Sequence, residues 1–251
     1  MIENDPTKNM AQPFVVIAAV RSGGTFLAHC LSSHPAVFCD RGESLHQASI
    51  WFTQIQTTRP ILLHCLTHMA GYQASGCKAL YHQAFKEDVW TYLLKQQPAT
   101  IWIRRENLIR QAVSVILNKL ARKGAIARPQ HSFQDVAPAR IALNPGHVLG
   151  QARNLRSLDE FAEGRMTQMK QALALTYAQI VGGERQYAQA LPDQATATLG
   201  AFLGVNFRVL RCDLTPINGA RLSETLENWP EVRAAIRDSE FASLLSDEGE
   251  E

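Results

Sequence analysis

Long apolar runs are missing from this chain of 251 residues. No window approaches the ~18 consecutive apolar residues that a membrane-spanning helix needs, so we expect no transmembrane segment. The N-terminal stretch MIENDPTKNMAQP is polar and lacks a basic region followed by an apolar one, so it does not resemble a signal peptide. We therefore expect a cytoplasmic protein.

Paired cysteines are missing as well. The five cysteines are scattered and form no C-x-x-C pair. A disulfide framework has denser, paired spacing in a shorter chain, and a zinc site has clustered cysteines and histidines. We therefore expect free thiols in a reducing compartment and no metal site.

A large excess of one sign of charge is also missing, because 25 Lys and Arg residues face 23 Asp and Glu residues and the formal net charge is only +2. This value is too small to argue for a nucleic-acid partner, so any anion site must arise from a local arrangement of charges. The content of 46% hydrophobic and 19% charged residues is ordinary for a globular protein. We expect a single domain over 1–251, with a core at about 14–233 and flexible tails at 1–12 and 246–251.

Apolar runs and helical periodicity alternate along the chain, which predicts a parallel sheet with helices on both faces. The predicted strands are 14–20, 36–39, 76–82, 99–103 and 172–177. The predicted helices are 25–33, 84–97, 105–122, 158–171 and 193–203, with two short ones in 48–73 and one in 221–241 interrupted at Pro230. Residues 124–150 show no regular pattern. The expected fold class is therefore three-layer α/β, with about five parallel strands and a strand-loop-helix similar to a P-loop.

The segment AVRSGGTF (19–26) lies where the first predicted strand passes into the first predicted helix. Gly23 and Gly24 permit positive φ and a close backbone approach. The amides of Ser22 to Phe26 would then form an anion-binding nest at the helix N-terminus, to which Ser22 and Thr25 add hydroxyls and Arg21 adds charge. The alternative is a tight strand-to-helix turn with no ligand.

This segment has no Gly-Lys-Ser/Thr ending, because Phe26 follows Thr25 and no lysine is near. A nucleotide triphosphatase loop needs that lysine for the γ-phosphate and the next hydroxyl for Mg²⁺. The loop therefore suits a terminal monophosphate or a phosphosulfate better than a metal-bound triphosphate.

A second segment, IWIRRENLIRQAVSVILNK (101–119), also joins a predicted strand to a predicted helix. Arg104 and Arg105 end the strand, and Ser114 lies about two and a half helical turns beyond. A guanidinium and a hydroxyl placed in this way can hold a second phosphate. The alternative is a solvated arginine pair with a helix serine that points to water.

Together, the two segments resemble the sulfotransferases that use 3′-phosphoadenosine 5′-phosphosulfate (PAPS), and are closest to the bacterial carbohydrate-type members. VRSGGTFLAHCLSSHP looks like the family's 5′-phosphosulfate loop, and RRENLIRQAVS resembles its 3′-phosphate segment. The resemblance implies that Arg21, Ser22, Gly23, Gly24, Thr25, Phe26, Arg105 and Ser114 bind the donor. Here Arg105 precedes the serine by nine residues and Arg104 by ten, against eight in the commoner family spacing. Either arginine can therefore be the ligand, and we prefer Arg105.

The resemblance also suggests which groups act in sulfuryl transfer. CDRGESLH is similar to the family's segment that carries a carboxylate base, which places Glu43 in that role. His46 competes for it, because an unperturbed histidine titrates near neutral pH. Lys78, in GCKALYH, resembles a recurrent Gly-x-Lys and would neutralise developing charge on the donor phosphate. The implied donor is PAPS, the product is adenosine 3′,5′-bisphosphate (PAP), and no metal is expected.

The expected activity is thus transfer of the sulfuryl group to a hydroxyl of a carbohydrate or small-molecule acceptor. Two alternatives stay open. One is a metal-dependent nucleotide or sugar kinase with an atypical phosphate loop. The other is an inactive member of the same fold that only binds, because Ala178 and Gln179 stand where the family has the acidic pair of Y-E-D-L.

Overall fold

A parallel five-stranded sheet lies at the centre of the computed structural model, which describes residues 11–41, 71–124, 140–183, 189–212 and 221–248. Its strand order is β2-β3-β1-β4-β5. The strands are β1 (Gln12–Ala18), β2 (Val37–Asp40), β3 (Ala74–Leu80), β4 (Ala99–Arg104) and β5 (Ala172–Thr176). Each begins and ends within two residues of its predicted position. The predicted α/β class with a parallel sheet is confirmed.

The central strand, β1, is apolar on both sides because both of its faces are covered. Phe14, Val16 and Ala18 join the core on one face of the sheet. Val15 and Ile17 join the core on the other face. This alternation explains why the strand is a continuous apolar run and not an alternating one.

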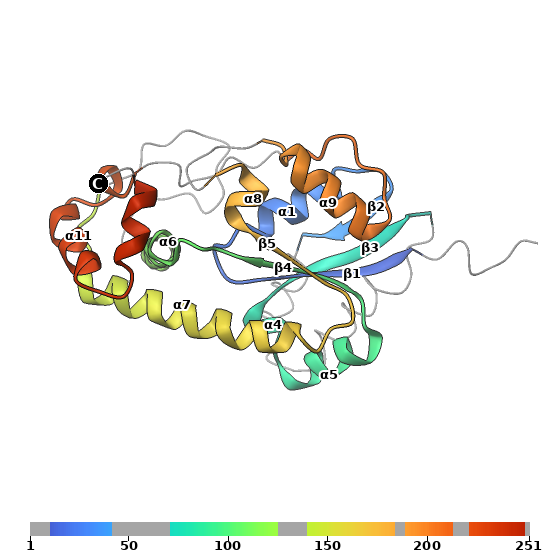
Figure 1. Ribbon diagram of the computed structural model, residues 1–251, viewed down its shortest axis with the longest axis horizontal. Helices are drawn as coiled ribbons and strands as arrows, with labels where there is room; N and C mark the ends of the chain where they lie inside the picture. The colour runs from blue at the N-terminus through green and yellow to red at the C-terminus, as the bar shows by residue number, and fades with distance from the viewer. Residues whose placement is uncertain (1–10, 42–70, 125–139, 184–188, 213–220, 249–251) are drawn as a thin grey trace, which may run out of the picture.

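Helices form a layer on each face of the sheet (Figure 1). The first face is covered by α1 (Gly24–Ser32), α8 (Tyr177–Val181) and α9 (Asp193–Leu203). The opposite face is covered by α4 (Tyr81–Ala84), α5 (Glu87–Gln96) and the end of α7 (Pro145–Met166). A third apolar cluster joins the first half of α7 to α6 (Leu108–Arg122), α10 (Leu222–Thr225), α11 (Trp229–Arg237) and the 3₁₀ helix η3 (Ala242–Glu248).

Helix α7 corrects the prediction for its part of the chain. We expected an irregular stretch at 124–150 and a helix only from 158, but α7 begins at Pro145 and has 22 residues. Asn144 caps it, since its Oδ1 accepts a hydrogen bond from the His147 amide at 3.1 Å. Asn followed by Pro is a normal helix start. Residues 125–139 and most of the predicted helical region 48–73 lie outside the described residues.

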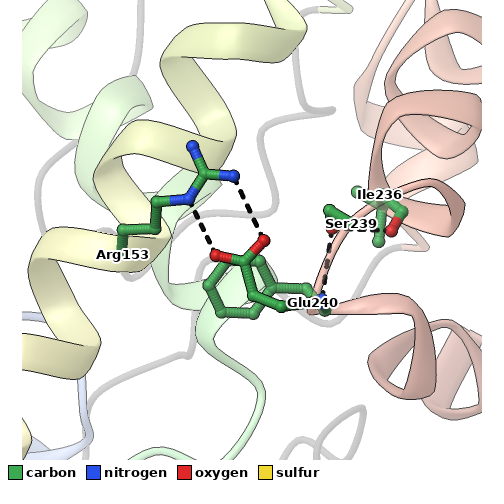
Figure 2. Close-up of polar contacts among 5 residues, drawn as sticks. Arg153, Ile236, Ser239 and Glu240 are labelled. Atoms are coloured by element: carbon green, nitrogen blue, oxygen red, sulfur yellow. Dashed lines mark hydrogen bonds and ion pairs between the residues drawn. The ribbon is translucent and has the colours of Figure 1, made fainter.

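The C-terminal segment is attached to α7 by polar and aromatic contacts, of which Figure 2 shows the polar one between Arg153 and Glu240. The Arg153 guanidinium donates to both carboxylate oxygens of Glu240, with Nε–Oε1 at 2.7 Å and NH2–Oε2 at 3.1 Å. Arg156 lies 4.2 Å from the ring centroid of Phe241. Pro230 lies in the first turn of α11, so the break in the predicted 221–241 helix precedes the proline.

Candidate anion-binding site

The loop between β1 and α1 turns sharply at the carboxyl edge of the sheet. Arg21 and Gly23 have left-handed backbone conformations, with φ of 62° and 89°. Ser22 is fully buried, and its hydroxyl is directed to the main-chain oxygens of Ala19 at 2.8 Å and Ile103 at 3.3 Å. The Ser22 hydroxyl therefore holds the loop against the end of β4.

The two glycines of the loop are required by close packing. A Cβ at Gly23 would lie 2.8 Å from Ile180 Cδ1 and 2.9 Å from Tyr177 Cδ2. A Cβ at Gly24 would lie 2.6 Å from the Cβ of Ala18. A side chain at either position would thus displace α8 or β1, so the sequence needs glycine here for the loop to lie against both elements.

Helix α1 starts in this loop with Gly24 as its first residue, and no side chain caps it. The first amides of a helix have no intrahelical acceptor, and the helix dipole adds partial positive charge at this end. The Phe26 side chain is buried in the core beneath the helix. Phe26 can therefore contribute to an anion site only through its backbone.

Lys78 reaches this helix N-terminus from the neighbouring strand. β3 pairs with β1, and Lys78 is opposite Val16. The side chain is buried, and Nζ donates a hydrogen bond to Thr25 Oγ1 at 2.9 Å. A positive charge on β3 is thus placed beside the first turn of α1, where it would add to the attraction for an anion.

The two sequence segments meet through Arg21 and Ser114. Arg21 Nε donates to Ser114 Oγ at 2.9 Å. Ser114 is buried in α6, which follows β4. Adjacent parallel strands bring their carboxyl ends to one edge of the sheet, which is why residues so distant in the sequence lie together.

Arg104 and Arg105 lie on opposite sides of the end of β4. The Arg105 guanidinium is buried 4.1 Å from the ring centroid of Tyr177, a residue packed against Gly23. The Arg104 guanidinium lies 5.4 Å from the ring centroid of Trp102, which belongs to the core of the other face. Only Arg105 of the two is therefore on the side of the loop and α1.

Tyr177 is a contact residue of this site that the sequence analysis does not assign. It is the first residue of α8, directly after β5, and its ring contacts both Arg105 and the position of Gly23. A cation over an aromatic ring is held electrostatically, so Tyr177 orients the guanidinium. The signal available was its place at the end of the fifth predicted strand, on the same edge as the two arginine segments.

A separate polar network lies on the other face of the sheet. Trp102 Nε1 donates to the Tyr81 hydroxyl at 2.6 Å, and that hydroxyl donates to Asp159 Oδ1 at 2.9 Å. Burial raises the pKa of Asp159 to about 6, although the Tyr81 hydroxyl and the charge of Arg104 act to lower this pKa. Arg104 thus belongs to this network and not to the loop.

The remaining predicted site residues, Glu43 and His46, lie outside the described residues. Within the described ranges, no three His, Cys, Asp or Glu side chains are grouped so that they could hold a metal ion. No helix in the described part of the chain is long and apolar enough to cross a membrane.

No protein-family model matches the chain, and neither does any curated protein sequence. Among solved structures, the chain is similar to a sulfotransferase domain from the curacin biosynthetic pathway. The two are 12% identical, with a TM-score of 0.47, and the match covers 80% of this chain and 76% of that domain.

Proposed function

We propose that the protein is a PAPS-dependent sulfotransferase that acts on a hydroxyl of a carbohydrate or small-molecule acceptor. The observation that carries the proposal is the contact between Arg21 and Ser114. It joins the two segments that resemble the family's 5′-phosphosulfate loop and 3′-phosphate segment. A donor with phosphate groups at both ends of one nucleoside would need both segments at the same edge of the sheet.

The residues divide between the two ends of this donor. The amides at the start of α1, with Lys78 and Thr25, suit the 5′-phosphosulfate because they offer uncapped N–H groups and a buried ammonium. Arg105 and Ser114 suit the 3′-phosphate, and Arg21 lies between the two groups. Charge-assisted hydrogen bonds from these cations supply the binding without a metal.

Sulfuryl transfer joins the acceptor oxygen to sulfur while the bond from sulfur to the bridging phosphate oxygen breaks. A general base takes the acceptor proton, and positive groups stabilise the charge that develops on the leaving oxygen. In this proposal Glu43 or His46 is the base, and Lys78 and Arg21 stabilise the leaving group. Lys78 is suited to this role because its ammonium already lies beside the first turn of α1.

The first test is thermal unfolding with adenosine 3′,5′-bisphosphate, and separately with ATP and Mg²⁺. At ~100 times its dissociation constant a ligand stabilises by about 2.7 kcal/mol, which should raise the midpoint by roughly 5–10 °C. Arg105→Ala should abolish the rise, while Arg104→Ala on the other side of β4 should keep it. A rise with ATP and Mg²⁺ alone would favour a kinase and contradict the proposal.

The base is tested by sulfuryl transfer from PAPS to a panel of sugars and small hydroxyl compounds. If Glu43 is the base, Glu43→Gln lowers kcat by a factor on the order of 10²–10⁴ and His46→Asn does not. The reverse result assigns the role to His46. Bisphosphate binding without turnover on any acceptor would instead favour the inactive, binding-only reading.

A further inference from the structure

Gln111, on α6, contacts the loop between β1 and α1, which is the candidate anion-binding loop. It lies on α6 one turn before Ser114 and is fully buried. Its Nε2 donates a hydrogen bond to the main-chain oxygen of Val20 at 2.8 Å. Val20 directly precedes Arg21, the residue whose backbone is left-handed and whose side chain reaches Ser114.

The orientation of this amide is determined by its partner. A carbonyl oxygen only accepts hydrogen bonds, so Nε2 and not Oε1 must face Val20. The Oε1 atom is then buried with no hydrogen-bond partner among the described residues. Buried polar atoms without a partner are uncommon and need a reason. An apolar side chain at this position would leave no unpartnered acceptor, but it could not donate to the Val20 oxygen. The hydrogen bond to Val20 is therefore the reason for an amide here.

We infer that Gln111 is a positioning residue that sets the conformation of the anion-binding loop. The φ angle of Arg21 is the rotation about its N–Cα bond, and the peptide plane that carries the Val20 oxygen is one end of that torsion. When Gln111 holds this oxygen, it fixes the plane at the φ of 62°. This φ region is unfavourable for residues other than glycine, so the hydrogen bond from Gln111 helps to keep Arg21 in this conformation.

The consequence is a link between α6 and both halves of the site. Gln111 and Ser114 are three residues apart and lie on one face of the helix. Gln111 holds the backbone before Arg21, and Ser114 accepts from the Arg21 side chain. Arg21 is therefore fixed at both ends by one helix. That the loop binds a phosphosulfate rests on the proposed function. That Gln111 holds the loop in its conformation does not.

The test compares Gln111→Met with Gln83→Met in the full chain. Gln83 is a second buried glutamine, in α4 on the face of the sheet opposite α1, and its Oε1 accepts from the Leu80 amide at 2.8 Å. Backbone hydrogen exchange is measured without ligand in peptides that cover 20–27. Gln111→Met should accelerate this exchange about tenfold, as expected when one well-formed hydrogen bond is lost. Gln83→Met should leave it unchanged. Equal exchange in Gln111→Met and wild type would overturn the inference.

Gln111→Glu adds a readout that a purely structural role would not move. Only its protonated carboxyl can donate to the Val20 oxygen, and the ionised form repels it. Exchange of 20–27, relative to wild type at the same pH, should therefore approach that of wild type at low pH and become faster as pH rises. Accelerated exchange that is constant between about pH 5 and 9 would overturn the role of the donated hydrogen bond.

Binding of adenosine 3′,5′-bisphosphate separates this inference from the proposed function. If the wild type binds it, Gln111→Met should weaken the affinity about tenfold and Gln83→Met should not. If the wild type does not bind it, the proposed function fails, while the exchange measurement still decides the role of Gln111. Faster loop exchange with unchanged affinity would overturn the link between Gln111 and the ligand site.

Discussion

Arg21 and Ser114 are 93 positions apart in the chain, yet the guanidinium Nε of the first donates to the hydroxyl of the second at 2.9 Å. Arg21 begins the turn into α1, and Ser114 lies within α6. The helix that follows β1 and the helix that follows β4 are thus connected at the carboxyl edge of the sheet. A ligand bound at this edge would contact both.

Arg21 combines a useful side chain with an unfavourable backbone, and two substitutions separate them. Arg21→Gly removes the side chain and suits the φ of 62°, whereas Arg21→Ala removes it and keeps the strain. We expect Arg21→Gly to be more stable than Arg21→Ala by about 1 kcal/mol. Both should bind adenosine 3′,5′-bisphosphate about tenfold or more weakly than wild type. Urea unfolding and calorimetry check this, and equal stability of the two variants would contradict it.

Gly23→Ala should lower the stability of the protein by steric conflict in the loop, without changing any charge. The added Cβ would lie within 2.9 Å of Ile180 and Tyr177, at a φ of 89°. We expect a loss of about 1–3 kcal/mol in the free energy of unfolding. Gly150→Ala is the control, because a Cβ there meets nothing within 4 Å and the residue is in helix α7. That variant should gain up to ~1 kcal/mol.

Lys78→Met keeps the aliphatic stem beside α1 and removes the ammonium. The hydrogen bond to Thr25 is lost, but so is the cost of burying a charge, so stability should change by less than about 1 kcal/mol. Affinity for the bisphosphate should fall about tenfold, because one charge-assisted contact is gone. Calorimetric titration measures the affinity, and Thr25→Ser, which keeps the hydroxyl, is the control. Unchanged affinity in Lys78→Met would exclude Lys78 from the site.

Asp159 predicts a pH dependence of stability. Its pKa is about 6 in the folded protein, above the 3.8 of an unperturbed aspartate, because burial disfavours the charged form. Between about pH 4 and 6 the folded state therefore binds more protons than the unfolded state. The contribution of Asp159 to the free energy of unfolding is fully present below its pKa in the unfolded chain. This contribution is lost as pH rises through 6, so the protein becomes less stable by about 1–3 kcal/mol.

Asp159→Asn tests this, because the amide oxygen can still accept from Tyr81 and does not titrate in this range. Unfolding free energies measured at several pH values between about 4 and 8 should decline less steeply with rising pH in the variant. Identical pH profiles for the variant and wild type would show that Asp159 titrates normally.

Much of the fold could be predicted because its signals are local. The apolar run of β1 and the periodicity of α9 can each be recognised within a few consecutive residues. The bounds of α9 (Asp193–Leu203) are those predicted. The start of α7 was missed although Asn144 and Pro145 mark it. Gly146 and Gly150 reduce the helical propensity of its first turns, and packing of Val148 and Ala152 in the cluster with α6 and α11 compensates.

The meeting of the two segments at one edge of the sheet could be predicted from the sequence, but the contacts between their side chains could not. The expected loop and the Arg105 segment meet at one edge, as the alternation of strands and helices indicates. The choice between Arg104 and Arg105 depends on which face of β4 each occupies, and so on which face α1 covers. The contacts of Lys78 with Thr25 and of Arg105 with Tyr177 depend on strand order, for which no single segment carries a signal.

The strand order also bears on how the chain reaches this structure. β1 occupies the middle of the sheet, and its partners come much later in the sequence: Phe14 pairs with Gly76 on one side and Ala99 on the other. Such non-local pairing slows folding, because long loops must close before the contacts form. During synthesis the apolar β1 segment leaves the ribosome long before either partner exists. We therefore expect the newly made N-terminal part of the chain to depend on chaperones until β4 has been translated.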